Sequence, residues 1–148
     1  MSRLRLAGGT VAVLGATTAL ALPAVASAAP TVTRIDTSQK GKKVTVTVKT
    51  KGFRIDADGV GGKPKSGRGH EHFQMDGGKY DYPKYSGANG KLAVQLGVQG
   101  KYSPSVTNAV TYKGLPKGRH KVTVFLVKND HSNYASKRAK KTITFRVK

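Results

Sequence analysis

The chain has 148 residues, with 27 lysines and arginines against 7 aspartates and glutamates, and no cysteine. This length allows one domain, and the lack of cysteine excludes disulfides, thiolate metal sites and cysteine nucleophiles. Any metal must therefore bind through nitrogen and oxygen ligands.

The N-terminal segment has the three regions of a secretory signal peptide. Arg3 and Arg5 supply the positive start, an apolar run covers residues 6–22, and Ala26-Ser27-Ala28 offers the small residues of a cleavage site. A membrane anchor is the alternative, but the run is shorter and richer in Gly and Thr than the ~20 strongly apolar residues of a spanning helix. We expect residues 1–28 to be removed, which leaves a chain without a membrane span that is extracellular or associated with the cell wall.

The mature chain, residues 29–148, alternates apolar and polar residues in short runs. The clearest run is 43–49, where three valines share one face, as expected for a half-buried strand. No window shows a convincing helical period, and turn clusters rich in Gly, Asn and Asp separate the runs. The sequence therefore predicts one all-β domain, an immunoglobulin-like antiparallel β-sandwich of seven to eight strands. The other predicted strands are 32–35, 120–126 and 142–147, with weaker candidates at 53–55, 71–75, 91–98 and 109–112.

A Gly-His-Glu-His motif at residues 69–72 opens the predicted strand at 71–75. Because side chains alternate along a strand, His70 and His72 share one face with Gln74 and Asp76, while Phe73 lies on the other face. Two histidines spaced in this way can converge on one metal ion, and imidazole suits copper, zinc or nickel. Such a site needs at least one further ligand.

The further ligand is expected from Asn129-Asp130-His131, which follows the strand at 120–126. If that strand neighbours the His-x-His strand, His131 completes a three-nitrogen set. Asp76, Asp130 or Glu71 would then serve as oxygen ligands or as acceptors for the rings. We predict a copper or zinc site on His70, His72 and His131, supported by Asp76 and Asp130. With ordinary histidine pKa values near ~6.5, this site should weaken below about pH 6.

The alternative interpretation is structural. Asn129 and Asp130 would then hydrogen-bond the backbone of a turn, and the histidines would fix loops by bonding to carbonyl groups. His120 shares the parity of Val122 and Val124, which favours a place at the end of the core face over a ligand role. We keep it as a reserve ligand.

The charge excess allows a second function. A secreted protein this basic is expected to adhere to anionic cell-wall polymers or other polyanions, although spread charges also simply keep a protein soluble. None of the basic runs matches a nucleic-acid-binding motif. Six tyrosines could stack on bases or sugars, yet tyrosines on strands usually pack; they are Tyr80, Tyr82, Tyr85, Tyr102, Tyr112 and Tyr134.

Patterns typical of catalysis are scarce. No serine has a Gly-x-Ser-x-Gly setting, and no glycine-rich loop ends in Lys-Ser or Lys-Thr before a helix. We therefore expect a protein that is not an enzyme.

Three motifs in this order resemble a group of small exported immunoglobulin-like domains, with an Ala-rich signal peptide of actinobacterial style. They are Gly-His-x-His-x-x-x-Asp-Gly at 69–77, Leu-x-x-Gly-x-His at 115–120 and Asn-Asp-His at 129–131. The resemblance spans residues 31–148. It implies an immunoglobulin-like sandwich outside the cytoplasm with no established enzymatic activity, and it favours a shared role for His70, His72 and His131. Because His120 belongs to the pattern, the resemblance also weakens the parity argument against it.

Overall fold

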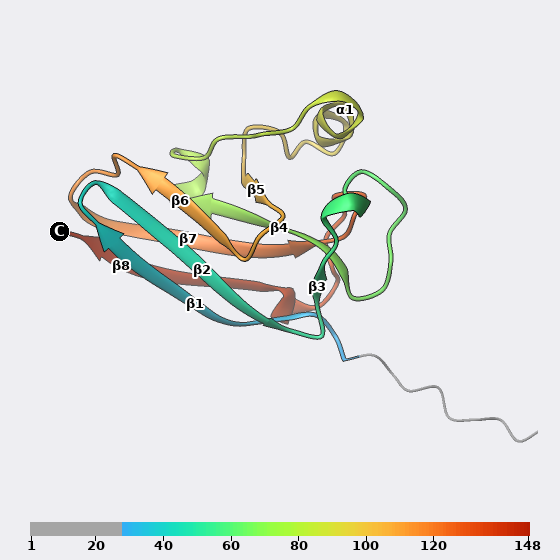
Figure 1. Ribbon diagram of the computed structural model, residues 1–148, viewed down its shortest axis with the longest axis horizontal. Coiled ribbons are helices and arrows are strands. Elements are labelled where there is room, and N and C mark those ends of the chain that lie inside the picture. Colours follow the sequence, from blue (N-terminus) through green and yellow to red (C-terminus); the bar gives the residue numbers. More distant parts are fainter. Residues whose placement is uncertain (1–27) are drawn as a thin grey trace, which may run out of the picture.

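The computed structural model describes residues 28–148, so the predicted signal peptide up to Ser27 lies outside the described residues. The described part contains eight strands, one α-helix and three short 3-10 helices (Figure 1). No helix in this part is both long enough and apolar enough to cross a membrane. The strands are β1 (Thr31–Lys40), β2 (Lys43–Lys51), β3 (Arg54–Ile55), β4 (Arg68–Met75), β5 (Ser103–Ser105), β6 (Ala109–Lys113), β7 (Gly118–Val127) and β8 (Lys140–Val147). The helices are η1 (Ala57–Gly59), η2 (Asp76–Gly78), α1 (Gly87–Gln95) and η3 (Lys137–Ala139).

These strands form two sheets, as an all-β sandwich requires. One sheet has the order β1-β2-β6, and the other has the order β3-β4-β7-β8, with β5 also paired to β4. The expectation of purely antiparallel pairing is wrong at one place, because β3 runs parallel to the start of β4. The loop between them, residues 56–67, carries the chain back to the end of the sheet where β3 began, so β4 sets out in the same direction.

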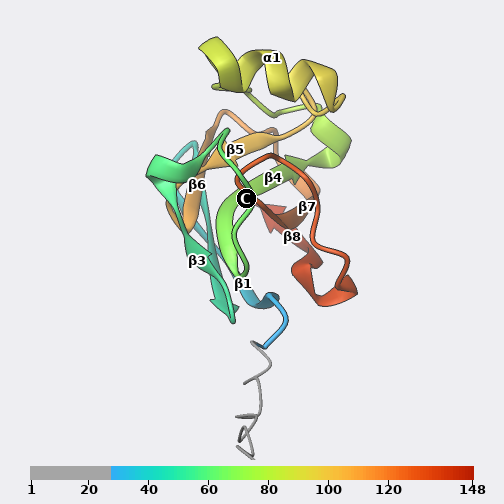
Figure 2. The same cartoon turned by 90° about the vertical axis from the view of Figure 1, so that its right-hand side faces the viewer.

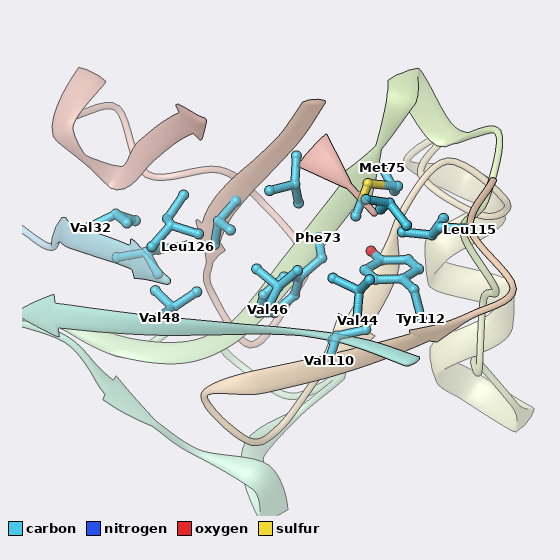
Figure 3. Packing of buried hydrophobic residues seen from close by; sticks show 14 of the residues in the cluster. Val32, Val44, Val46, Val48, Phe73, Met75, Val110, Tyr112, Leu115 and Leu126 are labelled. Atoms are coloured by element: carbon cyan, nitrogen blue, oxygen red, sulfur yellow. The ribbon is translucent and has the colours of Figure 1, made fainter. Parts of the chain in front are cut away.

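The core lies between the two sheets and follows from the alternation of each strand. Val44, Val46 and Val48 of β2 are at most 2% exposed, and they face Phe73 and Leu126 of the opposite sheet (Figure 3). Burying side chains of this size stabilises the fold by roughly 1.5–3 kcal/mol each. The predicted strands at 32–35, 43–49, 120–126 and 142–147 are confirmed in β1, β2, β7 and β8.

The chain between β4 and β5, residues 76–102, leaves the sheets and carries α1 on the side of β4 and β5 (Figures 1 and 2). We call this segment the excursion. The prediction of a strand at 91–98 is wrong, since most of this segment is helical. Only Ala93 of α1 is buried, whereas Val94 and Leu96 are 61% and 44% exposed. A short apolar run does not by itself distinguish a strand from a helix, and this run lies away from any strand with which it could pair.

A carboxylate fixes the start of this excursion. Asp81 accepts hydrogen bonds from the backbone N–H of Met75 at 2.8 Å, the hydroxyl of Ser103 at 2.7 Å and the hydroxyl of Tyr112 at 2.9 Å. These donors belong to β4, β5 and β6. One side chain thus connects both sheets with the segment that covers the outer face of β4.

Candidate metal centre

Strand β4 is buried on both faces. Phe73 and Met75 enter the core, so the opposite parity places His70 and His72 on the outer face of the sheet, where each is only 1% exposed. Gly69 allows this strand to approach β7 closely, because a Cβ atom at this position would lie 1.8 Å from the carbonyl oxygen of Val127. The glycine of the His-x-His motif is therefore required by packing.

His131 comes from the turn that follows β7. The expected neighbour relation is confirmed, because β4 pairs with β7 and His70 lies opposite Val127. His131 has a φ of 64°, which is uncommon for residues other than glycine, and its N–H donates to the carbonyl of Lys128 at 3.0 Å. This left-handed turn brings the His131 ring, which is 2% exposed, onto the His-x-His pair.

The three rings meet at the Nε2 atom of His70. This nitrogen lies 3.0 Å from Nε2 of His72 and 3.1 Å from Nδ1 of His131. All three candidate ligand atoms lie within 4.8 Å of one another, so the triad can hold a metal ion. The outward nitrogens, Nδ1 of His70 and Nε2 of His131, are buried and have no hydrogen-bond partner among the described residues.

Two tyrosines from the excursion cover the triad. The Tyr85 hydroxyl lies 2.7 Å from Nε2 of His72, and the Tyr102 ring stacks on the His72 ring with a centroid separation of 5.4 Å. The sequence does not predict that these two tyrosines contact the histidines, because their spacing along the chain shows no pattern that relates them to His70, His72 or His131. Their contacts with His72 depend on how the excursion folds over β4.

Burial keeps the three imidazoles neutral. Desolvation, with a smaller effect from His131, lowers the pKa of His70 to about 3. Desolvation also lowers the pKa of His72 well below its ordinary value and lowers that of His131, where the nearby Asp130 charge acts in the opposite direction. The expected weakening below about pH 6 assumed ordinary pKa values, so the structure moves it to a lower pH.

The predicted carboxylates do not join the ligand group. Asp76 lies 2.6 Å from Nδ1 of His120 and accepts from the N–H of Lys121 at 2.7 Å. Asp130 accepts from the N–H and the hydroxyl of Ser132, at 3.0 Å and 2.6 Å. Asp76 thus ties η2 to β7 and Asp130 holds the turn after β7, and neither lies among the clustered ligand atoms.

The reserve ligand and Glu71 also lie elsewhere. His120 is 4% exposed and engages both nitrogens, Nδ1 with Asp76 and Nε2 with the carbonyl of Pro116 at 2.8 Å. Its parity with the core residues is confirmed. Glu71 has the parity of Phe73, so its carboxyl group points away from the triad.

The structural interpretation is therefore correct for part of the motif. Asn129 donates to Asp56 at 2.9 Å and so ties the turn after β7 to the loop before β4. The partner of Asn129 is thus a side chain and not the turn backbone that was expected, whereas Asp130 and His120 do contact backbone groups, the N–H of Ser132 and the carbonyl of Pro116. The close contacts of the triad, in contrast, are with one another and with Tyr85.

The site thus belongs to a two-sheet β-protein with a buried cluster of three histidines that can hold a metal ion. Comparisons with models of known families, with curated proteins and with solved structures found no match. The family resemblance drawn from the motifs stays an expectation, and the functional argument depends on the geometry of the site.

Proposed function

We propose that the protein is a secreted, non-enzymatic β-sandwich protein of immunoglobulin-like topology that binds copper, or in second place zinc, through His70, His72 and His131. The three ligand atoms come from β4 and from the turn after β7, and β4 and β7 are hydrogen-bonded neighbours in one sheet. The ligand group consists of three imidazoles, a donor set that suits copper and zinc.

One observation carries the proposal: hydrogen bonds alone cannot explain how the rings meet. A ring nitrogen has either one hydrogen or one lone pair, yet Nε2 of His70 faces two other ring nitrogens at hydrogen-bond distance. Meanwhile Nδ1 of His70 and Nε2 of His131 are buried without partners. Unsatisfied buried polar groups cost roughly 1–3 kcal/mol each. A cation that receives the three converging lone pairs accounts for the meeting of the rings, and the ring hydrogens would then be on the other nitrogens, Nδ1 of His70 and Nε2 of His131 among them.

The donor set supports copper ahead of zinc. Affinity of a given nitrogen site for divalent metals rises along the first row to copper(II) and falls again at zinc, and imidazole suits both ions.

The test is calorimetric titration of the metal-free protein with copper(II) and with zinc(II). We expect one ion per chain, tighter binding of copper, and a loss of at least about 100-fold in affinity for the His70→Gln/His72→Gln variant. Asp130→Asn is the matched control, because an asparagine oxygen still accepts from Ser132 and Asp130 lies outside the ligand group. Equal affinities for the double variant and the parent protein would contradict the proposal.

A second candidate function is attachment to anionic cell-wall polymers. The register of the first sheet places Lys40 opposite Lys43 and Lys43 opposite Lys113, and all three side chains are exposed. Like charges directly opposite each other destabilise a sheet, and a polyanion lying across the row would relieve this repulsion. This row places three of the 27 basic residues of the chain side by side on one sheet.

Salt distinguishes the two candidates. Binding to isolated cell walls should fall steeply between about 50 and 200 mM salt, while metal binding should change little. Replacing the three lysines of the row by glutamine should weaken wall binding more than the same change at three exposed lysines outside that sheet. Equal losses for both triple variants would remove the second candidate. The control lysines are Lys63, Lys91 and Lys101.

A further inference from the structure

A cavity of about 330 Å³ reaches the metal centre from one side. It lies between the loop after β3, the start of the excursion and the end of β5, and its wall includes His70 and Tyr85. His72 and His131 are not part of this wall. The cavity therefore leads to the side of the cluster where His70 and Tyr85 lie.

The lining favours an anion. Its polar residues include Lys84, Ser86 and Asn89, and none of its lining residues is acidic. The amide oxygen of Asn89 is buried without a hydrogen-bond partner among the described residues.

The triad itself leaves room for such a ligand. Three protein ligands with no fourth imidazole or carboxylate in the group leave a coordination position open on copper or zinc. Nδ1 of His70 is a second buried atom without a partner, and it belongs to a ring that lines the cavity. His70 thus connects the ligand group to a cavity whose lining contains no acidic residue.

We infer that a small anion, inorganic or a short carboxylate, enters this cavity and binds the metal ion as its exogenous ligand. The inference rests on the proposed metal function and adds the chemical class of a second ligand to it. A bound anion would balance the positive charge of a divalent ion that three neutral imidazoles leave uncompensated.

Azide is a suitable probe, because its coordination to copper(II) produces a charge-transfer absorption band. The copper-loaded protein is titrated with azide, and we expect the band to grow to saturation with one azide per copper. Ala57→Trp should weaken azide binding at least about tenfold, since Ala57 is an exposed residue of the cavity wall and contacts none of the three rings by hydrogen bonds. Ala88→Trp is the control, an equally exposed alanine on α1 outside the wall.

The outcomes separate the inference from the proposed function. If copper binds but azide produces no band, the inference is wrong and the metal site stands. If Ala57→Trp and Ala88→Trp bind azide as tightly as the parent protein, the cavity is not the binding route and the inference also fails. If calorimetry detects no copper binding at all, the proposed function fails first.

Discussion

Glu71 allows a test of whether β4, the strand that carries His70 and His72, is buried on both faces. It lies between the two triad histidines of β4 but has the parity of Phe73 and Met75, and it is only 1% exposed. Burial raises the pKa of its carboxyl group to about 8 from an ordinary value of 4.5. One of its oxygens, Oε2, has no hydrogen-bond partner among the described residues. We therefore expect Glu71→Gln to change the pH dependence of folding.

The direction follows from proton linkage. Between pH 4.5 and about pH 8 the folded protein keeps a proton on Glu71 that the unfolded chain releases. The stability associated with this group is therefore complete below pH 4.5 and is lost as the pH rises through 8. Each pH unit within this window removes up to about 1.4 kcal/mol from the free energy of unfolding. The total approaches about 5 kcal/mol well above pH 8 and is about 4 kcal/mol between pH 4.5 and pH 8.5, which is a large part of the stability of a domain this size.

Glutamine has nearly the same shape as the protonated acid and does not titrate. We expect the variant and the parent protein to have similar free energies of unfolding near pH 4.5, and the variant to be more stable by about 3–4 kcal/mol at pH 8.5. Urea denaturation followed by circular dichroism, with a chelator present, measures this difference at each pH. The contributions of the histidines are common to both proteins and cancel.

Parallel curves of stability against pH from 4.5 to 8.5 would refute the reasoning, because they would mean that Glu71 ionises freely in the folded protein. A variant that is less stable at every pH by a constant amount would have the same meaning. In either case the carboxyl group would have to reach water, and the packing described for the face of Phe73 and Met75 would be wrong.

Three further predictions concern the site and its support. Copper affinity, measured by competition with a chromogenic chelator, should fall less than about tenfold between pH 7 and pH 5. The reason is that burial lowers the pKa of His70 to about 3 and also lowers those of the other two triad histidines. A fall of several thousandfold would indicate ordinary exposed imidazoles. Tyr85→Phe should raise copper affinity about fivefold in the same assay, because it removes the 2.7 Å contact between the Tyr85 hydroxyl and Nε2 of His72. A lower affinity would instead identify Tyr85 as a ligand. His120→Gln should lower the free energy of unfolding by about 1–3 kcal/mol through loss of the hydrogen bond with Asp76. The copper stoichiometry by calorimetry should stay at one, and loss of copper binding by the folded variant would contradict the separation of His120 from the site.

The sequence predicted the site better than it predicted the segment that covers it. Period two in β4 places His70 and His72 on one face, and the position of Asn-Asp-His directly after a strongly alternating strand placed His131 at the end of β7. Both inferences use only local geometry. The expected carboxylates failed because local geometry gives the face of a side chain but not its partner, and Asp76 finds His120 across the sheet.

Tyr85 and α1 are features of the structure that could not be predicted from the sequence. Residues 87–95 bury a single alanine, so the helix has no apolar period by which to recognise it, and the short apolar run at 91–98 was predicted as a strand instead. Tyr85 reaches His72 because Asp81 anchors the excursion to β4, β5 and β6, and no feature of the chain near Tyr85 marks that contact. The separation of two such residues along the sequence depends only on the length of the loops between them. It therefore does not indicate that they meet in the folded protein.

By itself the sequence determined the strands, the face that each side chain occupies and the lack of sulfur ligands, because alternation and composition are properties of the chain. Only the tertiary structure decided which groups meet: that three imidazoles converge under two tyrosines, that His120 takes Asp76 away from them, and that their rings lose the water that would protonate them. Desolvation and convergence depend on what the rest of the chain places around a residue, and for that reason they can be read only from the folded protein.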